Sequence, residues 1–198
     1  MLAVRESDFM NNALPPIDTA LQKDAIHVSD LPALELYIDQ VITLIEQGYA
    51  SNRRGSEEKP LTKMMINNYS KAGLVRPIKG KRYAKEHIVQ MLIIYALKST
   101  LSMNDIKNVL DTLYDQPDFD SAALFEGYES ALLKQRQALG SLEAQLTASK
   151  LFEAETPPDR FASLMAICAM SDALSRLAER MVAGYFAPPG GAKAAHKK

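Results

Sequence analysis

Residues 61–83 read Leu-Thr-Lys-Met-Met-Ile-Asn-Asn-Tyr-Ser-Lys-Ala-Gly-Leu-Val-Arg-Pro-Ile-Lys-Gly-Lys-Arg-Tyr, and this stretch decides the fold. Its first half predicts a helix over 62–72. Thr62 is a favoured residue at a helix start, and Gly73 suits the left-handed conformation that often ends a helix. Pro77 prevents the helix from continuing. The helix is therefore short, and a non-helical segment must follow it.

That following segment, Val75–Tyr83, predicts a small β-hairpin with a tight turn at Lys79-Gly80. An isolated hairpin is only marginally stable, so we expect it to pack against neighbouring helices or to gain order from a ligand. Four of its nine residues are cationic, namely Arg76, Lys79, Lys81 and Arg82. The sequence thus predicts a basic wing directly after a helix.

The charge of the chain is concentrated around this stretch. The 198 residues have a net charge of −1, but residues 1–50 carry −6, residues 51–100 carry +8 and residues 101–198 carry −3. A basic segment between acidic ones favours a polyanionic partner, nucleic acid first. The alternative is a solvated basic face without a partner, and charge alone gives the two interpretations equal weight.

Helices are predicted on both sides of the basic stretch. Upstream, a helix is expected from Pro32 to Gly48, followed by a polar loop over Ser51–Lys59. Downstream, the helix Lys85–Ser99 is apolar nearly all round, which indicates a central, buried position. Ser102 then begins a helix with a single apolar stripe. The order is helix, loop, helix, wing, helix, helix, which is the organisation of a winged helix-turn-helix.

The C-terminal half has the spacing of packed helices. Apolar residues recur three and four apart from Phe125 to Leu146, interrupted by Gln135, and again from Ile167 to Met181. We expect two long helices that form either an antiparallel hairpin or two seams of a dimer bundle. The predicted fold class is mainly α, with an N-terminal arm (1–29), a winged helix-turn-helix domain (30–118), a helical dimerisation or packing region (119–186) and a flexible tail (187–198).

The sequence also predicts the compartment. Cys168 is the one cysteine, so no internal disulfide forms and a reducing compartment fits; we expect its side chain to be packed. The longest uninterrupted apolar stretch near the middle, Met91–Leu97, is far shorter than a membrane span of about 20 residues. The N-terminus does not have the pattern of a signal peptide. We expect a soluble, cytoplasmic protein that does not bind membranes.

Two families share these motifs. Residues 65–77 resemble the recognition helix and exit of the mercury-resistance-regulator (MerR) type, in the Tyr, the Lys, the Gly-Leu pair and the following Pro. Residues 81–88 look like the wing strand and third helix of that family, and residues 101–110 like its fourth helix. More closely, Leu36–Val41, together with Leu61-Thr62-Lys63 and Ile66–Tyr69, resembles a bacterial family named domain of unknown function 1836. The resemblance covers about residues 30–114.

The helix-wing order and the MerR resemblance imply a transcriptional regulator that binds duplex DNA through helix 62–72 and wing 76–83. A helix of this size fits the major groove, and a wing beside it reaches phosphates. Because symmetric dimers read two half-sites, we also expect a homodimer. The candidate contact residues are Lys63, Asn67, Asn68, Tyr69, Lys71, Arg76, Lys79, Lys81, Arg82 and Tyr83. A core position is the stronger alternative for Tyr69, and a solvated helix face is an equal alternative for the two asparagines.

Catalysis is not expected. The sequence has no Gly-rich phosphate loop, nucleophile elbow or zinc-binding helix, and its three histidines are scattered, so we expect no metal and no cofactor. Two other functions stay open. One is a non-catalytic protein-interaction module that keeps the winged fold. The other is a small-ligand sensor for an unknown effector, with a pocket among Met165, Cys168, Met170 and Met181.

Overall fold

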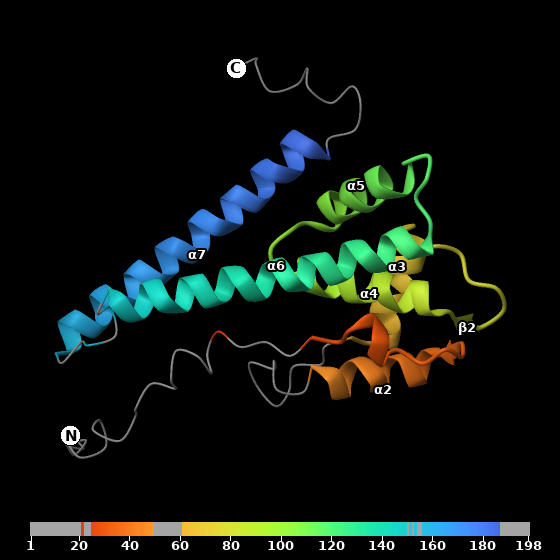
Figure 1. Cartoon of the computed structure of the whole chain (residues 1–198), viewed down its shortest axis with the longest axis horizontal. Coiled ribbons are helices and arrows are strands. Elements are labelled where there is room, and N and C mark those ends of the chain that lie inside the picture. Colours follow the sequence, from red (N-terminus) through yellow and green to blue (C-terminus); the bar gives the residue numbers. More distant parts are fainter. Residues whose placement is uncertain are drawn as a thin grey trace, which may run out of the picture.

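The computed structural model describes residues 21, 25–49, 61–149, 151, 153 and 156–186, which are mainly helical (Figure 1). Its elements in chain order are the 3-10 turn η2 (Val28–Asp30), β1 (Leu36–Tyr37), α2 (Ile38–Gly48), α3 (Lys63–Lys71), β2 (Arg82–Tyr83), α4 (Lys85–Leu97), α5 (Met103–Tyr114), α6 (Ser121–Ala148) and α7 (Pro157–Tyr185). Most of the expected arm over 1–29, the loop Ser51–Lys59 and the tail 187–198 lie outside the described residues.

Helix α4 is the centre of the core, as its all-round apolar sequence predicts. Five of its apolar side chains have no exposed surface: Ile88, Val89, Met91, Leu92 and Ile94. Helix α6 packs along one side of it and β2 contacts it on another. Its first turn lacks the usual Ser or Thr cap; instead the N–H of Ala84 donates to Nδ1 of His87 at 3.1 Å. A side chain inside the helix thus satisfies a backbone donor at its start.

The boundaries of α3 confirm the local signals in the quoted stretch. The Thr62 hydroxyl accepts the N–H of Met65 at 3.2 Å, which satisfies one of the free donors at the helix start. Gly73 adopts a φ of +72°, and the N–H of Leu74 donates back to the carbonyl of Tyr69 at 2.9 Å. This is the helix end that a glycine makes possible, because a Cβ at positive φ costs about 1–2 kcal/mol.

The helix predicted from Pro32 is wrong over its first turns. Residues 31–35 are not helical, β1 follows them, and α2 begins only at Ile38. The side-chain Oε1 of Gln40 accepts the N–H of Tyr37 at 2.8 Å, which caps α2 at that position. Leu34 is 78% exposed and so is not part of the buried face. Pro32 and the apolar spacing favour a helix locally. Residues 36–37 form the strand β1 instead, because they pair with the distant strand β2.

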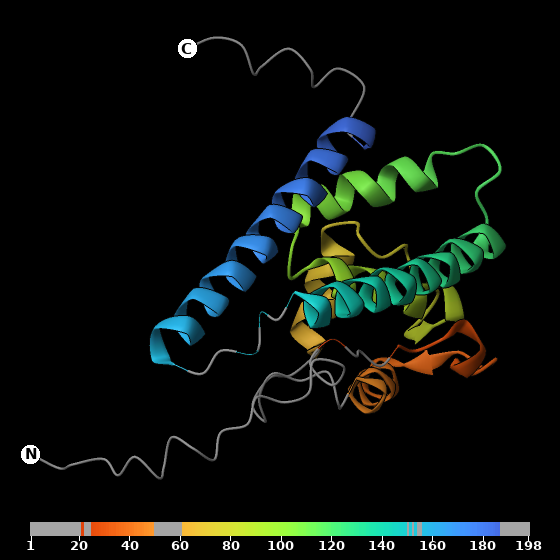
Figure 2. The same ribbon diagram turned by 60° about the vertical axis from the view of Figure 1, so that its left-hand side comes forward.

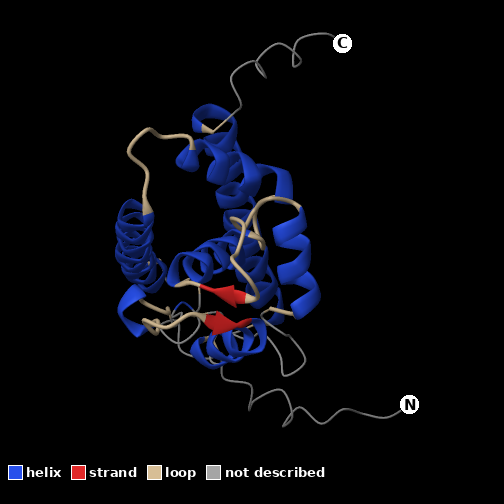
Figure 3. Ribbon diagram, turned by 90° about the vertical axis from the view of Figure 1, so that its right-hand side faces the viewer, coloured by secondary structure: helices blue, strands red, loops and turns tan. Residues whose placement is uncertain are grey.

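The pairing of β1 with β2 also contradicts the predicted hairpin. The strand β2 pairs antiparallel with β1, with Leu36 opposite Tyr83 and Tyr37 opposite Arg82, and not with the residues just before the turn (Figure 3). The turn itself is present, because Gly80 has a φ of +68°. Pairing with β1 leaves residues 76–81 as a loop that projects between α3 and the two-stranded sheet. The chain has a basic loop in place of the expected two-stranded wing.

The two long helices do not form an antiparallel hairpin. Helix α6 packs on α4, whereas α7 diverges from α6 after the connection and meets α5 near its own C-terminal end (Figures 1 and 2). Val182 is the one buried residue of α7. The residues with three-four spacing on α7 therefore lack a partner helix in the described part of the chain. Of the two predicted arrangements, the intrachain hairpin is the one that the structure contradicts.

The segment before β1 is tied to α6 by Glu129. One carboxylate oxygen accepts the N–H of Val28 at 2.6 Å, and the other lies 2.8 Å from Nδ1 of His27. Next to it, the Tyr128 hydroxyl donates to the carbonyl of Ile26 at 2.9 Å. Partial burial alone would raise the pKa of Glu129, but the bonds from Val28 and His27 outweigh it and lower that pKa below its ordinary value.

We therefore expect Glu129→Gln to destabilise the protein at neutral pH, by less than about 1 kcal/mol because the carboxylate is partly solvated. A carboxyl whose pKa is lower in the folded state stabilises that state above its unfolded pKa and loses the effect as pH falls through the folded pKa. The difference between wild type and variant should shrink below about pH 4.5, the ordinary value of Glu. Denaturant titrations from pH 7 to 3 measure it. Glu126→Gln, an exposed carboxyl on the same helix, should show no such trend.

Candidate nucleic-acid interface

Helix α3 presents one polar face to solvent. Ile66 has no exposed surface and Tyr69 retains 6%, so these two side chains fix the buried side of the helix. Lys63, Asn67 and Lys71 are exposed and follow each other at intervals of four residues, which places them in a row along the opposite side. Met64 and Asn68 extend the same surface. The exposed face therefore offers cations at both ends and amides between them.

Two of the candidate cations meet at one corner of the fold, where β1 runs into α2. Nζ of Lys63 lies 3.0 Å from Oδ1 of Asp39, in the first turn of α2. A guanidinium nitrogen of Arg82 donates to the Tyr37 hydroxyl at 3.2 Å, and the guanidinium lies 5.3 Å from the centre of that ring. Because Tyr37 and Asp39 are two residues apart, the start of α3 and the strand β2 lie beside each other at this corner.

The loop between α3 and β2 carries the remaining exposed charge. Lys79 and Lys81 flank the positive-φ Gly80, and a Cβ built on that glycine would meet no atom within 4 Å. In the described part of the chain, no ion pair involves Lys71, Lys79 or Lys81. From Leu61 to Lys85 the sequence holds seven Lys and Arg residues and no Asp or Glu. This stretch is the basic surface of the molecule, and we call it the basic segment.

Gln90 fixes the start of the loop from inside the core. Its side chain is 1% exposed, and its Oε1 accepts the N–H of Arg76 at 2.9 Å. The guanidinium of Arg76 lies 4.3 Å from the centre of the Tyr114 ring on α5. Burial raises the pKa of Tyr114 to about 12, although the nearby Arg76 lowers it, so this ring stays neutral at physiological pH. The loop is thus held at its base by α4 and α5.

The structure divides the ten candidate contact residues into two groups. Seven are exposed: Lys63, Asn67, Asn68, Lys71, Lys79, Lys81 and Arg82. The other three are not available as free contacts. Tyr69 and Tyr83 are core residues with 6% and 4% exposure, and burial raises the pKa of both hydroxyls. Arg76 is half-buried against Tyr114.

Sequence reasoning missed the residues that support the site. Tyr37 and Asp39 position Arg82 and Lys63, and nothing in their local sequence marks them for that role. Gln90 was detectable, because it is a polar residue inside a helix that is otherwise apolar nearly all round. A buried amide requires a hydrogen-bond partner, and that partner is the loop.

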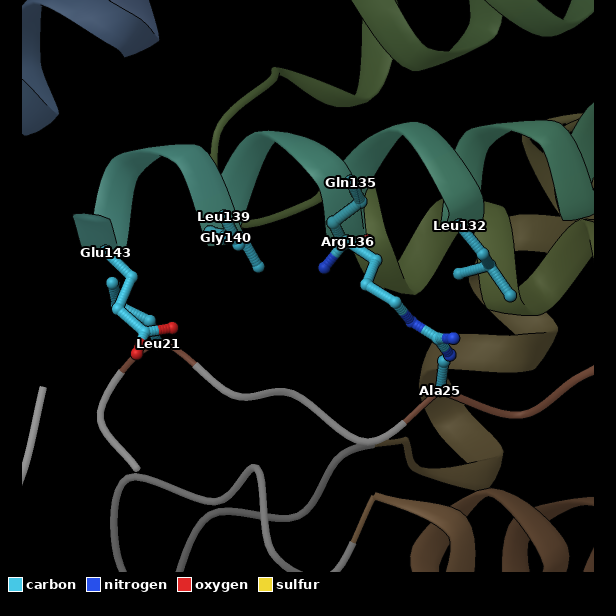
Figure 4. Close-up of a pocket in the computed structure, with 8 residues that line it drawn as sticks. All are labelled: Leu21, Ala25, Leu132, Gln135, Arg136, Leu139, Gly140 and Glu143. Carbon is cyan, nitrogen blue, oxygen red and sulfur yellow. The ribbon is translucent and has the colours of Figure 1, made fainter. Parts of the chain in front are cut away.

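The four residues proposed to line a ligand pocket do not form one. Met165, Cys168, Met170 and Met181 are all exposed on α7, which also corrects the expectation that Cys168 is packed. A cavity of about 330 Å³ lies elsewhere, between α6 and the segment before η2 (Figure 4). Its lining is mixed, with Leu132, Leu139 and Gly140 beside the polar Gln135, Arg136 and Glu143.

Comparison with known proteins gives one match. The family model described as domain of unknown function (DUF1836) matches residues 26–131, which is more than half of the chain. No curated protein and no solved structure matches the chain. The matched range runs from the segment before η2 through the basic segment, α4 and α5 into the first half of α6. The chain therefore belongs to the DUF1836 family.

Proposed function

We propose that the chain is a cytoplasmic, MerR-like transcriptional regulator that binds duplex DNA through α3 and the basic loop 76–81. The observation that carries this proposal is the basic segment itself. It contains no acidic residue, and five of its cations are exposed: Lys63, Lys71, Lys79, Lys81 and Arg82. Charge of one sign on a surface raises the local concentration of a polyanion.

The side chains on α3 suit contacts to base edges. An α-helix fits the major groove, where an Asn side chain forms two hydrogen bonds to adenine and a Lys side chain donates to guanine. Asn67 and Asn68 are both exposed on α3. Met64 is 73% exposed and offers an apolar contact for a thymine methyl group. In this proposal α3 reads sequence.

The basic loop and the corner at Tyr37–Asp39 suit contacts to the backbone. Lys79 and Lys81 are both exposed on the loop and flank Gly80, so their ammonium groups are free to approach phosphates. Arg82 keeps a charged guanidinium beside Tyr37, whose hydroxyl bond raises the pKa of that arginine further. Phosphate contacts of this kind fix orientation without selecting a base sequence.

A salt series tests the proposal. Fluorescence anisotropy with a labelled random duplex should show binding at 50 mM salt that weakens steeply towards 200 mM. If each of the five exposed cations neutralises one phosphate, the plot of log affinity against log salt has a slope of about −4.5, because each contact contributes about −0.9. A slope near zero, or the absence of binding at low salt, would rule out duplex DNA as the ligand of this surface.

A further inference from the structure

The outer face of the corner between β1 and α2 carries two acidic residues beside two of the exposed cations. Glu35 and Tyr37 are exposed, whereas Leu36 between them is partly buried, so the first two share the outer side of the strand. The register of the sheet sets Tyr37 directly opposite Arg82 on that side. Asp39 follows in the first turn of α2 and is also exposed.

Both cations of the corner are engaged in the free protein. Nζ of Lys63 lies 3.0 Å from Oδ1 and 3.2 Å from Oδ2 of Asp39. Arg82 donates to the Tyr37 hydroxyl, which is the main reason that its pKa is raised, and the nearby charge of Glu35 adds to that effect. The side chains of Lys63 and Asp39 keep 57% and 75% of their surfaces exposed, so an external anion can reach them.

The other exposed cations of the basic segment differ in this respect. Lys71, Lys79 and Lys81 form no ion pair among the residues that the structure describes. The basic segment itself contains no acidic residue, so the carboxylates at the corner come from a part of the chain more than 20 residues upstream of Lys63 and Arg82. The fold thus brings acidic partners to two of the five exposed cations and leaves three without them.

We propose that Glu35 and Asp39 compete with DNA phosphates for Arg82 and Lys63 and thereby weaken binding to duplexes of any sequence. This competition rests on the proposed function, because it requires that the basic segment binds DNA. Carboxylate and phosphate oxygens accept the same charge-assisted hydrogen bonds from Lys and Arg. A phosphate that approaches Lys63 must therefore displace Asp39, whose charge then lies beside the DNA backbone.

A weaker contact to the backbone changes what determines affinity. Phosphate contacts orient a protein on DNA without carrying sequence information, whereas contacts to base edges select the site. If the cations at the corner contribute less to binding, a larger share of the binding free energy comes from the exposed side chains of α3. The two carboxylates would in this way limit retention on non-cognate DNA.

Asp39 also has a local structural role, and the two roles predict opposite changes in affinity. An Asp in the first turn of a helix is favoured by the partial positive charge of the helix start, and a Lys at the first residue of α3 is disfavoured for the same reason. If Asp39 only stabilises the fold, its loss lowers stability and does not strengthen binding. Competition with phosphate predicts tighter binding.

The first experiment removes both negative charges. Glu35→Gln with Asp39→Asn should bind a labelled random duplex about tenfold more tightly than wild type at 50 mM salt in fluorescence anisotropy, because the interactions of exposed charges that it removes are each worth a few-fold in affinity. The difference should shrink towards 200 mM, where exposed charges are better screened. Helical circular dichroism should be unchanged, since both side chains are exposed.

The matched control is Glu126→Gln with Asp172→Asn. It makes the same change in net charge at exposed positions on α6 and α7, outside the corner. Asp172 is also a suitable counterpart of Asp39, because it is an exposed carboxylate that pairs with a cation, Arg176. The control should bind the duplex with wild-type affinity.

A double-mutant cycle tests whether Asp39 acts through Lys63. In a Lys63→Gln background, no ammonium group is left for the carboxylate to occupy. Asp39→Asn should therefore tighten binding about threefold in the wild-type background and less than about 1.5-fold in the Lys63→Gln background.

The outcomes separate this competition from the proposed function. If wild type binds the duplex and the variant without the two carboxylates binds no more tightly, the competition is overturned and the DNA proposal stands. An equal gain from Asp39→Asn with and without Lys63 would also overturn it, as would equal tightening in the control, which would assign the effect to net charge. Absence of duplex binding by both wild type and the variant at 50 mM salt would overturn the two proposals together.

Discussion

Reversing the charge of Lys79 and Lys81 to Glu is expected to weaken duplex binding about 100-fold at 50 mM salt. Each lost phosphate contact flattens the salt slope by about 0.9, so the double variant should have a slope flatter by about 1.8. The introduced carboxylates add repulsion at low salt, where charges are least screened. Both side chains are exposed on a loop and have no ion pair among the described residues, so the free energy of unfolding should change by less than about 0.5 kcal/mol.

The matched control is Lys134→Glu with Arg136→Glu on α6. This pair makes the same change in net charge at exposed positions outside the basic segment. If binding depends on the local surface, the control should retain nearly wild-type affinity and slope. Equal weakening in both variants would show that net charge alone governs binding, and unchanged affinity of the Lys79 and Lys81 variant would show that the loop does not touch DNA.

Local signals predicted both ends of α3 and the start of α5 correctly. Thr62, Gly73 and Ser102 each act within four residues of their own position, and each has the role that its chemistry indicates. The central position of α4 also followed from sequence, because a helix without a polar face must be surrounded by protein. These features depend only on residues that are close in the chain, so a single sequence is enough to predict them.

Long-range pairing was not predictable in the same way. The strand β2 consists of two residues, and its partner β1 precedes it by 45 residues, so neither has a periodicity of its own. The segment just before Gly80 is the nearer partner, because a tight turn usually joins two adjacent strands, and it was therefore the predicted one. Arg82 and Lys63 lie at one corner only because of that distant pairing and the contact of α2 with α3. The sequence therefore predicts a set of candidate residues, but it does not predict how they are arranged in space.

The side of α3 on which each candidate residue lies decides whether it is exposed or buried. A helix nine residues long has two sides, and Ile66 fixes which of them faces α2 and the core. Tyr69 lies three residues later on the same side and must be buried with it. Asn67 and Lys71 fall on the other side. The candidate residues include both exposed and buried positions of α3. A resemblance to a family identifies matching residues in the sequence, but it does not show on which side of the helix they lie.

Gln90→Leu is expected to impair duplex binding although it removes no charge and lies inside the core. The Gln90 side chain accepts the N–H of Arg76 at 2.9 Å, which fixes the first residue of the basic loop against α4. Leucine has a similar volume but no acceptor, so that N–H loses its partner at a cost of about 1–3 kcal/mol in the free energy of unfolding. A loop released at its base must be ordered again when it binds phosphates, and that entropy reduces affinity.

Met91→Leu distinguishes loop positioning from general instability. Met91 is fully buried in the next position of the same helix, and a volume-conserving exchange there costs less than about 1.5 kcal/mol and leaves the bond between Gln90 and Arg76 in place. At a temperature where both variants are folded, Gln90→Leu should lower affinity and speed amide exchange in residues 76–81, and Met91→Leu should do neither. Equal losses of affinity in the two variants would show that both substitutions weaken binding by destabilising the fold, and that release of the loop has no separate effect. A loss of affinity with faster amide exchange only in Gln90→Leu would show that the Gln90 side chain positions the basic loop through its bond to Arg76.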